Sequence, residues 1–364
     1  GSLETLKCKH LLFAFLFVGV CQLSAKKSYG QAPVKLWHGI EREVRYHPEG
    51  RDFVIQNGKR RFNRALYGTN TAFRVETGDL PEFAMYLPGM GGNLKFGIIN
   101  GDKSKWLIDA ASIEARYRPG TMIYKIKDDL LGNGTLNIQV LAGSTAENIL
   151  VKASFTNTGK GVKLFWAFGG ATGKKFSRDG DIGADPESSF YLKPAYCKGN
   201  EYQFSGQHFL LNFSGKSLGE SARYENEQNS AGVDESEVVT KNVLYGIYPL
   251  SQQVHIADAN EQSTPVATLN SKGDASPMIS GVIDVVSGKD LFWGIQNTMK
   301  LKEGDVPHLF AASEAAREKL ASRVVVNTPD PYINTFGGAL SMAADGIWES
   351  PSYMHGAVAW RMRL

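Results

Sequence analysis

The side chains best suited to chemistry lie close together late in the sequence, at Trp348, Glu349, His355, Trp360 and Arg361. A tryptophan ring offers an apolar face on which the C–H face of a sugar can pack, and charged or imidazole groups can hold the sugar hydroxyls. We therefore expect these five residues to bind a carbohydrate substrate. The competing interpretation is structural, with both tryptophans in a helical core and Glu349 paired with Arg361.

The sequence lacks the spacings that mark common metal and phosphate sites. None of its seven histidines stands four residues from another, so a helical zinc site has no support. The stretch Gly169–Lys175 has several glycines but lacks the phosphate-loop spacing, because Lys175 stands where Ser or Thr is required. We expect neither a metal nor another cofactor.

The stretch 169–186 is long, polar and rich in glycine, which is unusual for a turn between strands and typical of a functional loop. It carries Asp179, Asp181 and Asp185, but no Glu closes the pattern as it does in an EF-hand calcium loop. We expect a solvated loop that does not bind metal.

Residues 1–30 have the features of a secretory signal peptide. Lys7 and Lys9 precede the apolar run Leu11–Val20, which is too short to span a bilayer, and Ser28 and Gly30 suit cleavage before Gln31. We therefore expect an exported protein, periplasmic or extracellular, with no transmembrane segment once the leader is removed.

Cleavage after Ala25 is the alternative, and lipidation at Cys21 is disfavoured because Val20 is larger than the residue that usually precedes a lipidated cysteine. Of three cysteines, only Cys197 follows the leader, so no intrachain disulfide is expected. We interpret Cys197 as a partly buried apolar residue rather than a nucleophile.

The charge balance argues against nucleic acid as a partner. The sequence has 40 basic and 37 acidic residues, and residues 1–30 hold four lysines and one glutamate, which leaves 36 of each sign. A neutral chain has no global field to attract a polyanion.

Short alternating segments separated by Gly, Asn, Asp and Pro dominate residues 31–304 and predict a large antiparallel β-sandwich. We expect one hairpin around Asn57-Gly58 and another around Pro119-Gly120, and the strand 93–100 to turn at Gly101. Further strands are expected at 135–141, 148–156, 162–168, 207–213, 237–248, 279–286 and 291–296.

The period becomes helical from Val306, with apolar positions that include Phe310, Ala312, Ala316 and Val324. We expect a linker helix within residues 305–327, capped by Asp305, with Pro307 in its first turn.

Pro331 is expected to begin a second helix, which extends toward Ala344. The last apolar run, 357–364, contains no residue that ends a helix, so we expect residues 328–364 to be the start of a longer helical domain.

This order of parts resembles the N-terminal half of glycoside hydrolases with a six-hairpin (α/α)6 barrel, in which a galactose-mutarotase-like supersandwich precedes a linker helix and the catalytic barrel. The stretch Thr328-Pro-Asp-Pro331 through Arg361, together with Arg51-Asp-Phe53 and Gly91-Gly-Asn-Leu94, is similar to the domain-of-unknown-function 4450 family.

The resemblance implies that this chain is the sandwich and the first helices of an exported glycoside hydrolase. The catalytic carboxyl pair would then lie in the missing C-terminal barrel, so the catalytic residues stay unknown and the chain alone should be inactive. A phosphorylase of the same architecture is an alternative that export disfavours. A non-catalytic carbohydrate-binding or surface-assembly protein is the alternative from another functional class.

Overall fold

The computed structural model describes residues 44–87, 89–173, 187–218, 237–297, 299–302, 304–349, 352–355 and 362–363. Every element discussed below belongs to the compact unit formed by residues 45–364. The predicted leader, including Cys21, lies outside the described residues.

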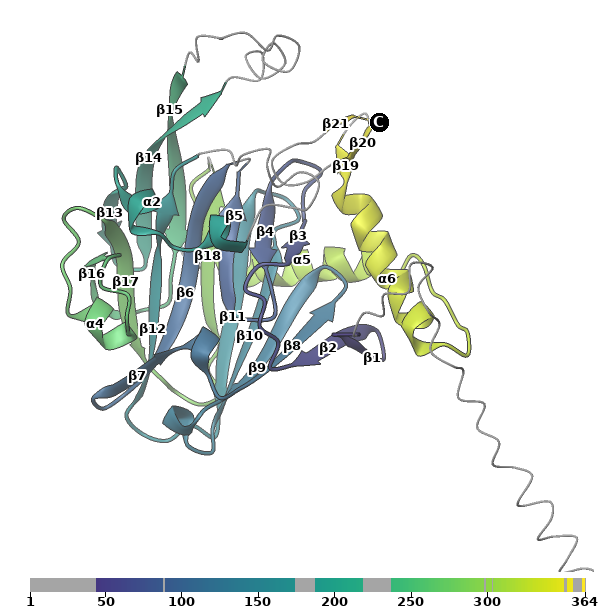
Figure 1. Ribbon diagram of the computed structural model, residues 1–364, viewed down its shortest axis with the longest axis horizontal. Helices are drawn as coiled ribbons and strands as arrows, with labels where there is room; N and C mark the ends of the chain where they lie inside the picture. The colour runs from purple at the N-terminus through teal and green to yellow at the C-terminus, as the bar shows by residue number, and fades with distance from the viewer. Residues whose placement is uncertain are drawn as a thin grey trace, which may run out of the picture. The chain divides into compact units, whose positions relative to one another are not determined.

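Two large antiparallel sheets make up the described fold, which confirms the mainly β architecture expected from the sequence (Figure 1). The ten-stranded sheet has, in spatial order, β1 (His47–Glu49), β2 (Asp52–Gln56), β8 (Ser112–Arg118), β9 (Thr121–Lys127), β10 (Thr135–Ala142), β11 (Asn148–Thr156), β18 (Leu291–Asn297), β15 (Glu237–Ile247), β14 (His208–Leu218) and β13 (Glu201–Ser205). The eight-stranded sheet has β16 (Gln252–Asp258), β17 (Pro277–Asp284), β12 (Val162–Ala171), β6 (Met90–Asn100), β5 (Glu82–Tyr86), β4 (Arg74–Thr77) and β3 (Arg64–Leu66), with β7 (Lys103–Trp106) paired to β6.

Two of the predicted turns are confirmed. Strands β8 and β9 form a hairpin in which Arg118 lies opposite Thr121, and Gly120 adopts φ +90° at its tip. A residue with a side chain would be strained at this φ, which explains the Pro-Gly pair. Strand β6 likewise turns through Gly101, at φ +64°, into β7.

The predicted hairpin at Asn57-Gly58 is wrong. Strand β2 pairs with β1 and β8, and the residues after Gly58 form no strand with it. The Asn57 side chain instead accepts a hydrogen bond from the Ile113 backbone nitrogen at 2.8 Å. The chain then crosses to the other sheet, where Gly58 lies so close to Asp79 that a Cβ would collide with it.

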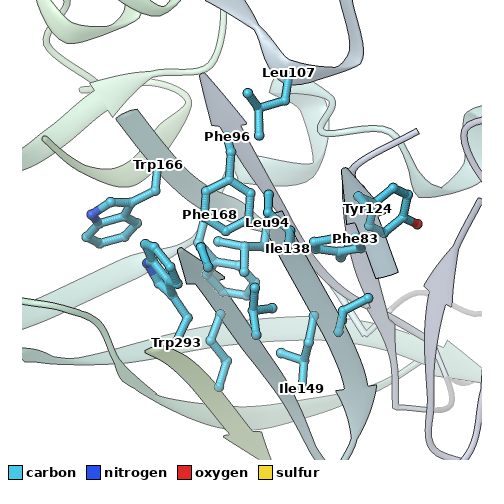
Figure 2. Close-up of a cluster of buried hydrophobic side chains, with 14 of the residues drawn as sticks. Phe83, Leu94, Phe96, Leu107, Tyr124, Ile138, Ile149, Trp166, Phe168 and Trp293 are labelled. Atoms are coloured by element: carbon cyan, nitrogen blue, oxygen red, sulfur yellow. The ribbon is translucent and has the colours of Figure 1, made fainter. Parts of the chain in front are cut away.

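The core lies between the sheets because alternate residues of each strand point inward. On β11, Ile149 and Val151 face this core, whereas Leu150 faces outward. Figure 2 shows aromatic side chains from both sheets in contact, and the rings of Phe96 on β6 and Trp293 on β18 lie 4.9 Å apart, edge to face. Such aromatic pairs stabilise beyond the area they bury.

A helix, α5 (Asp305–Ala321), covers part of the outer face of the ten-stranded sheet (Figure 1). Its residues Val306 and Phe310 form a second apolar cluster with the outward-facing Leu141 and Leu150. Phe310 also packs edge to face on Phe292, with ring centroids 5.8 Å apart.

The start and the buried face of α5 differ from the prediction. Gly304, at φ +85°, occupies the N-cap position, and Asp305 is the first helical residue. Ser313 and Arg317 are buried, whereas Ala312 and Ala316 are exposed. Ser313 and Arg317 face the sheet because they form hydrogen bonds with Ser144 and Pro119, which lie in turns between strands. The helix ends at Ala321, before Val324.

The outer face of the eight-stranded sheet carries two short helices, α2 (Pro194–Cys197) and α4 (Pro265–Leu269). Among the described residues, the 3-10 turns η1 (Leu107–Asp109), η2 (Asp129–Leu131) and η4 (Glu187–Phe190) connect neighbouring elements. No helix among the described residues has the length and apolar content needed to cross a membrane.

Candidate functional site

The predicted site begins at helix α6 (Pro331–Gly346), whose start is confirmed at Pro331. The Asp330 carboxylate caps the helix by accepting a hydrogen bond from the Tyr332 backbone nitrogen at 2.8 Å. Asn334 and Thr328 exchange hydrogen bonds, including one from the Asn334 amide to the Thr328 carbonyl at 2.9 Å. The Thr-Pro-Asp-Pro sequence therefore acts as a helix start.

One face of α6 packs closely on the sandwich. The Thr335 hydroxyl donates to the Gly50 carbonyl at 2.7 Å, beside strand β1. A Cβ on Gly346 would lie 2.7 Å from the Tyr67 ring, and one on Gly338 would lie 3.0 Å from Pro119. Glycine at these positions lets the helix backbone approach the sandwich, and the approach fixes where the residues after α6 lie.

Three short strands follow α6: β19 (Trp348–Glu349), β20 (Ser352–His355) and β21 (Met362–Arg363). Trp348 lies opposite Tyr353, and their rings meet edge to face with centroids 5.0 Å apart. Trp348 is half-buried and Tyr353 is 49% exposed. The pair is an aromatic surface of the kind that a sugar ring can contact.

The structure places the other predicted site residues only in part. Glu349 ends β19 and His355 ends β20, where it lies opposite Met362. Trp360 and Arg361 fall outside the described residues. Whether these four side chains converge with Trp348 therefore stays a prediction. Tyr353, which sequence reasoning did not select, joins the candidate site through the pairing of β19 with β20.

A cleft of about 230 Å³ lies between the β1–β2 turn, the end of α5 and the start of α6. Its polar groups are already used: Arg51 pairs with Glu318, and Asn334 and Thr335 make the bonds given above. This cleft is a seam between sheet and helices, with few groups left for a ligand.

Both ends of the glycine-rich stretch 169–186 are held firmly. The stretch begins as the last residues of β12, where the Asn200 amide donates to the Ala171 carbonyl at 2.7 Å. Beyond the stretch, Glu187 accepts from the Arg61 backbone nitrogen at 2.9 Å. Residues 174–186, with all three aspartates, lie outside the described residues.

Charged side chains hold the segment that begins at Glu187 against the eight-stranded sheet. Arg61 binds Glu82 through two hydrogen bonds of 2.8 Å and stacks on the Tyr191 ring at 3.6 Å. Nearby on β6, burial lowers the pKa of Lys95, whose ammonium group lies 4.0 Å from the Trp106 ring centre. Because these charged groups are buried and already have partners, they fasten the segment to the sheet.

A Gly-x-Ser-x-Gly spacing, which can mark a serine nucleophile, occurs at Gly215–Gly219. Ser217 lies within β14, where it is opposite Val238 of β15. A nucleophile elbow requires a sharp turn from strand to helix, so this spacing does not build one.

The remaining reactive groups give no catalytic centre among the described residues. Cys197 is buried, and burial raises the pKa of its thiol to about 12, which suits an apolar packing residue and not a nucleophile. Within the same residues, no three His, Cys, Asp or Glu side chains meet at a metal-sized position.

The chain is similar to solved structures and matches a protein family. A bacterial glucoamylase, solved in complex with acarbose, is similar at 9% identity with a TM-score of 0.42. The alignment covers 82% of this chain and 43% of the glucoamylase chain, so this chain spans less than half the length of that one. No curated protein matches the chain. The family model described as Domain of unknown function (DUF4450) matches residues 87–314, more than half of the sequence, and the chain therefore belongs to this family.

Proposed function

We propose that this chain is the N-terminal part of an exported glycoside hydrolase that acts on a polysaccharide or oligosaccharide. The sandwich is then a scaffold, and α6 is the first helix of a helical catalytic domain. The observation that carries this proposal is an exposed apolar stripe on α6, most of which lies away from the face that packs on the sandwich. At its edge, Phe336 also meets the Phe53 ring of β2 edge to face, with ring centroids 5.7 Å apart.

The α6 apolar stripe consists of Ile333, Phe336, Leu340 and Ile347, which are 50%, 51%, 56% and 41% exposed. Their spacing of three, four and seven residues puts them on one side of the helix. An amphipathic surface helix would carry charged residues there. A helix that is apolar on both sides is normally buried on both, so the stripe fits a position between the sandwich and further helices.

The proposed site follows from the position of this helix. Because α6 is fixed against the sandwich, Trp348 and Tyr353 stand just beyond its C-terminal end, at the edge of the proposed catalytic domain. Glu349, His355, Trp360 and Arg361 would add groups that bind sugar hydroxyls. The catalytic carboxyl pair would come from the barrel itself, so residues of this chain orient the substrate and shield it from water.

The test is to express the full-length reading frame and measure reducing-sugar release across a panel of polysaccharides. We expect release from at least one substrate, and a loss of about tenfold in kcat/KM for Trp348→Ala if a ring-stacking contact is removed. Leu250→Ala, at an exposed position on the sandwich, is the control and should leave kcat/KM unchanged. A folded full-length protein that releases sugar from no substrate would refute the proposal and favour a non-catalytic binding protein.

A further inference from the structure

A groove of about 320 Å³ lies on the outer face of the ten-stranded sheet, at its β13–β14–β15 end. It is far from α6, which contacts β1 at the opposite edge of the same sheet. Nine strand spacings separate the two edges, roughly 40 Å at about 4.8 Å each. The groove is therefore a separate feature from the site proposed above.

The strand register explains which side chains line this groove. Gln203 lies opposite Leu210, which lies opposite Tyr245, so these three form one row across β13, β14 and β15. Their neighbours Leu211 and Leu244 are buried in the core between the sheets, so the row faces outward. Side chains directly opposite each other lie about 5 Å apart, close enough to hold one ligand together.

A second row, of Ser205, His208 and Ile247, runs beside the first. Ile247 packs with Leu301 and with Val306 of α5. Leu301 and the adjacent Lys300 line the groove on that side. The segment that leads into α5 thus forms one wall of the groove on the sheet surface.

The polar groups of the groove are free to bind a ligand. The side chains of Gln203, Ser205, His208 and Lys300 are exposed and make no hydrogen bond to a described residue. They line the same groove as the half-buried Tyr245 ring. An aromatic ring that shares a groove with amide, hydroxyl and imidazole groups matches a sugar, which has an apolar ring face and a rim of hydroxyls.

The charge of the side chains that line the groove indicates which kind of sugar it can bind. Lys300 is a full positive charge, and no carboxylate of the described residues lines the groove. The nearest carboxylate on the same face of β13 is that of Glu201, two residues from Gln203 and so about 7 Å along the strand. An anionic group on the sugar would find a partner at Lys300 and no opposing acid beside it.

We propose that this groove binds a saccharide unit that carries a carboxylate or sulfate group, with its ring against Tyr245 and its anionic group at Lys300. This goes beyond the proposed hydrolase, because the groove belongs to the sandwich and needs no catalytic domain. Such a site would hold an acidic polysaccharide on the protein without cleaving it.

Calorimetric titration of the full chain tests the proposal with three probes: trigalacturonate for the carboxylate, a sulfated carrageenan oligosaccharide for the sulfate, and neutral maltotriose. We expect one or both acidic probes to bind, with maltotriose at least about fivefold weaker, since one charge-assisted contact is lost. Raising the salt from about 20 mM to about 500 mM should narrow this difference, because an exposed charge pair is screened.

Variants identify the groove as the binding surface. Tyr245→Ala should weaken the acidic probe about tenfold and Tyr245→Phe by less than about twofold, since the phenylalanine keeps the ring. Lys300→Gln should abolish the preference for acidic probes, whereas Lys289→Gln, at an exposed position away from the groove, should leave it intact. Ser205→Trp places a large side chain in the groove from the exposed end of β13, and it tests the site independently if Tyr245→Ala does not fold.

The proposal is overturned if no acidic probe binds, if maltotriose binds as well as they do, or if binding survives both Lys300→Gln and Ser205→Trp. None of these results bears on the hydrolase, which is judged by sugar release from the full-length protein. Absence of sugar release, in turn, leaves the groove proposal standing.

Discussion

The two long helices, α5 and α6, follow one another along the chain but differ in how much of their apolar surface is buried. Helix α5 buries a single stripe against the sheet and leaves the rest of its surface to alanines and charged residues. Helix α6 buries one face against the sandwich and exposes large apolar side chains on the other. The difference indicates that the sheet alone covers the apolar face of α5, whereas α6 has apolar surface for the sandwich and for a second packing partner.

The largest expected effect is on α5. Phe310→Ala removes a buried ring between the helix and Phe292, and should lower the free energy of unfolding by about 3 kcal/mol, as other buried Phe→Ala changes do. Phe336→Ala on α6 is the matched control and should cost less than half as much, because its ring is half exposed. Urea unfolding followed by tryptophan fluorescence measures both, and equal losses would contradict the distinction between the helices.

The next largest effect concerns the polar anchor of α5. Buried Arg317 donates to the Pro119 carbonyl at 2.7 Å and to Glu314 at 2.9 Å. Arg317→Met keeps most of the volume but leaves that carbonyl without its partner, which should cost about 2 kcal/mol. Lys319→Met, on the exposed side of the same helix, should change stability by less than about 0.5 kcal/mol. An Arg317 variant as stable as Lys319→Met would show that packing alone positions α5.

The α6 apolar stripe predicts opposite results in two proteins. In this chain, Leu340→Glu should change the free energy of unfolding by less than about 1 kcal/mol, because the side chain is already exposed. It should also reduce self-association in sedimentation and the binding of an apolar dye. In the full-length protein the same change would bury a charge, and should abolish sugar release or folding. Tolerance in both proteins would mean that nothing packs on the stripe.

The smallest expected effect depends on pH. The hydrogen bond from Arg51 lowers the pKa of Glu318 to about 2, from an ordinary value of 4.5. Because the folded pKa is the lower one, the pair stabilises the fold above about pH 4.5, and this contribution is lost as the pH falls toward 2. Both side chains are partly exposed, so the contribution after screening should stay below about 1 kcal/mol. Glu318→Gln should remove this part of the pH dependence of the melting temperature, whereas Asp330→Asn should leave it.

The sequence predicted the strands well where local chemistry decides them. The Pro119-Gly120 turn, the turn at Gly101 and the start of α6 at Pro331 all follow from backbone preferences of single residues. The Asn57-Gly58 hairpin failed because the Asn57 side chain binds β8 instead, a long-range contact that no local pattern contains. The prediction that Ala312 and Ala316 are buried failed for the same reason. Ser313 and Arg317 are buried instead, through contacts with Ser144 and Pro119, which are distant in sequence.

The candidate site was harder to predict than the fold. Residue types alone selected Trp348 but missed Tyr353, whose role depends on the two-stranded pairing that places the rings together. They also missed the groove at Tyr245, because its lining comes from three strands and the segment before α5, which only the folded sheet brings together.

Helix α5 also joins the two regions that the proposals concern. It starts near Lys300 at the groove and ends beside the seam under the start of α6, and its 17 residues span about 25 Å at about 1.5 Å per residue. Because the groove lies on the ten-stranded sheet and α6 packs on the same sandwich, the folded sheet fixes the distance between the groove and α6. A long sugar chain that contacted both regions would therefore meet them at a constant separation.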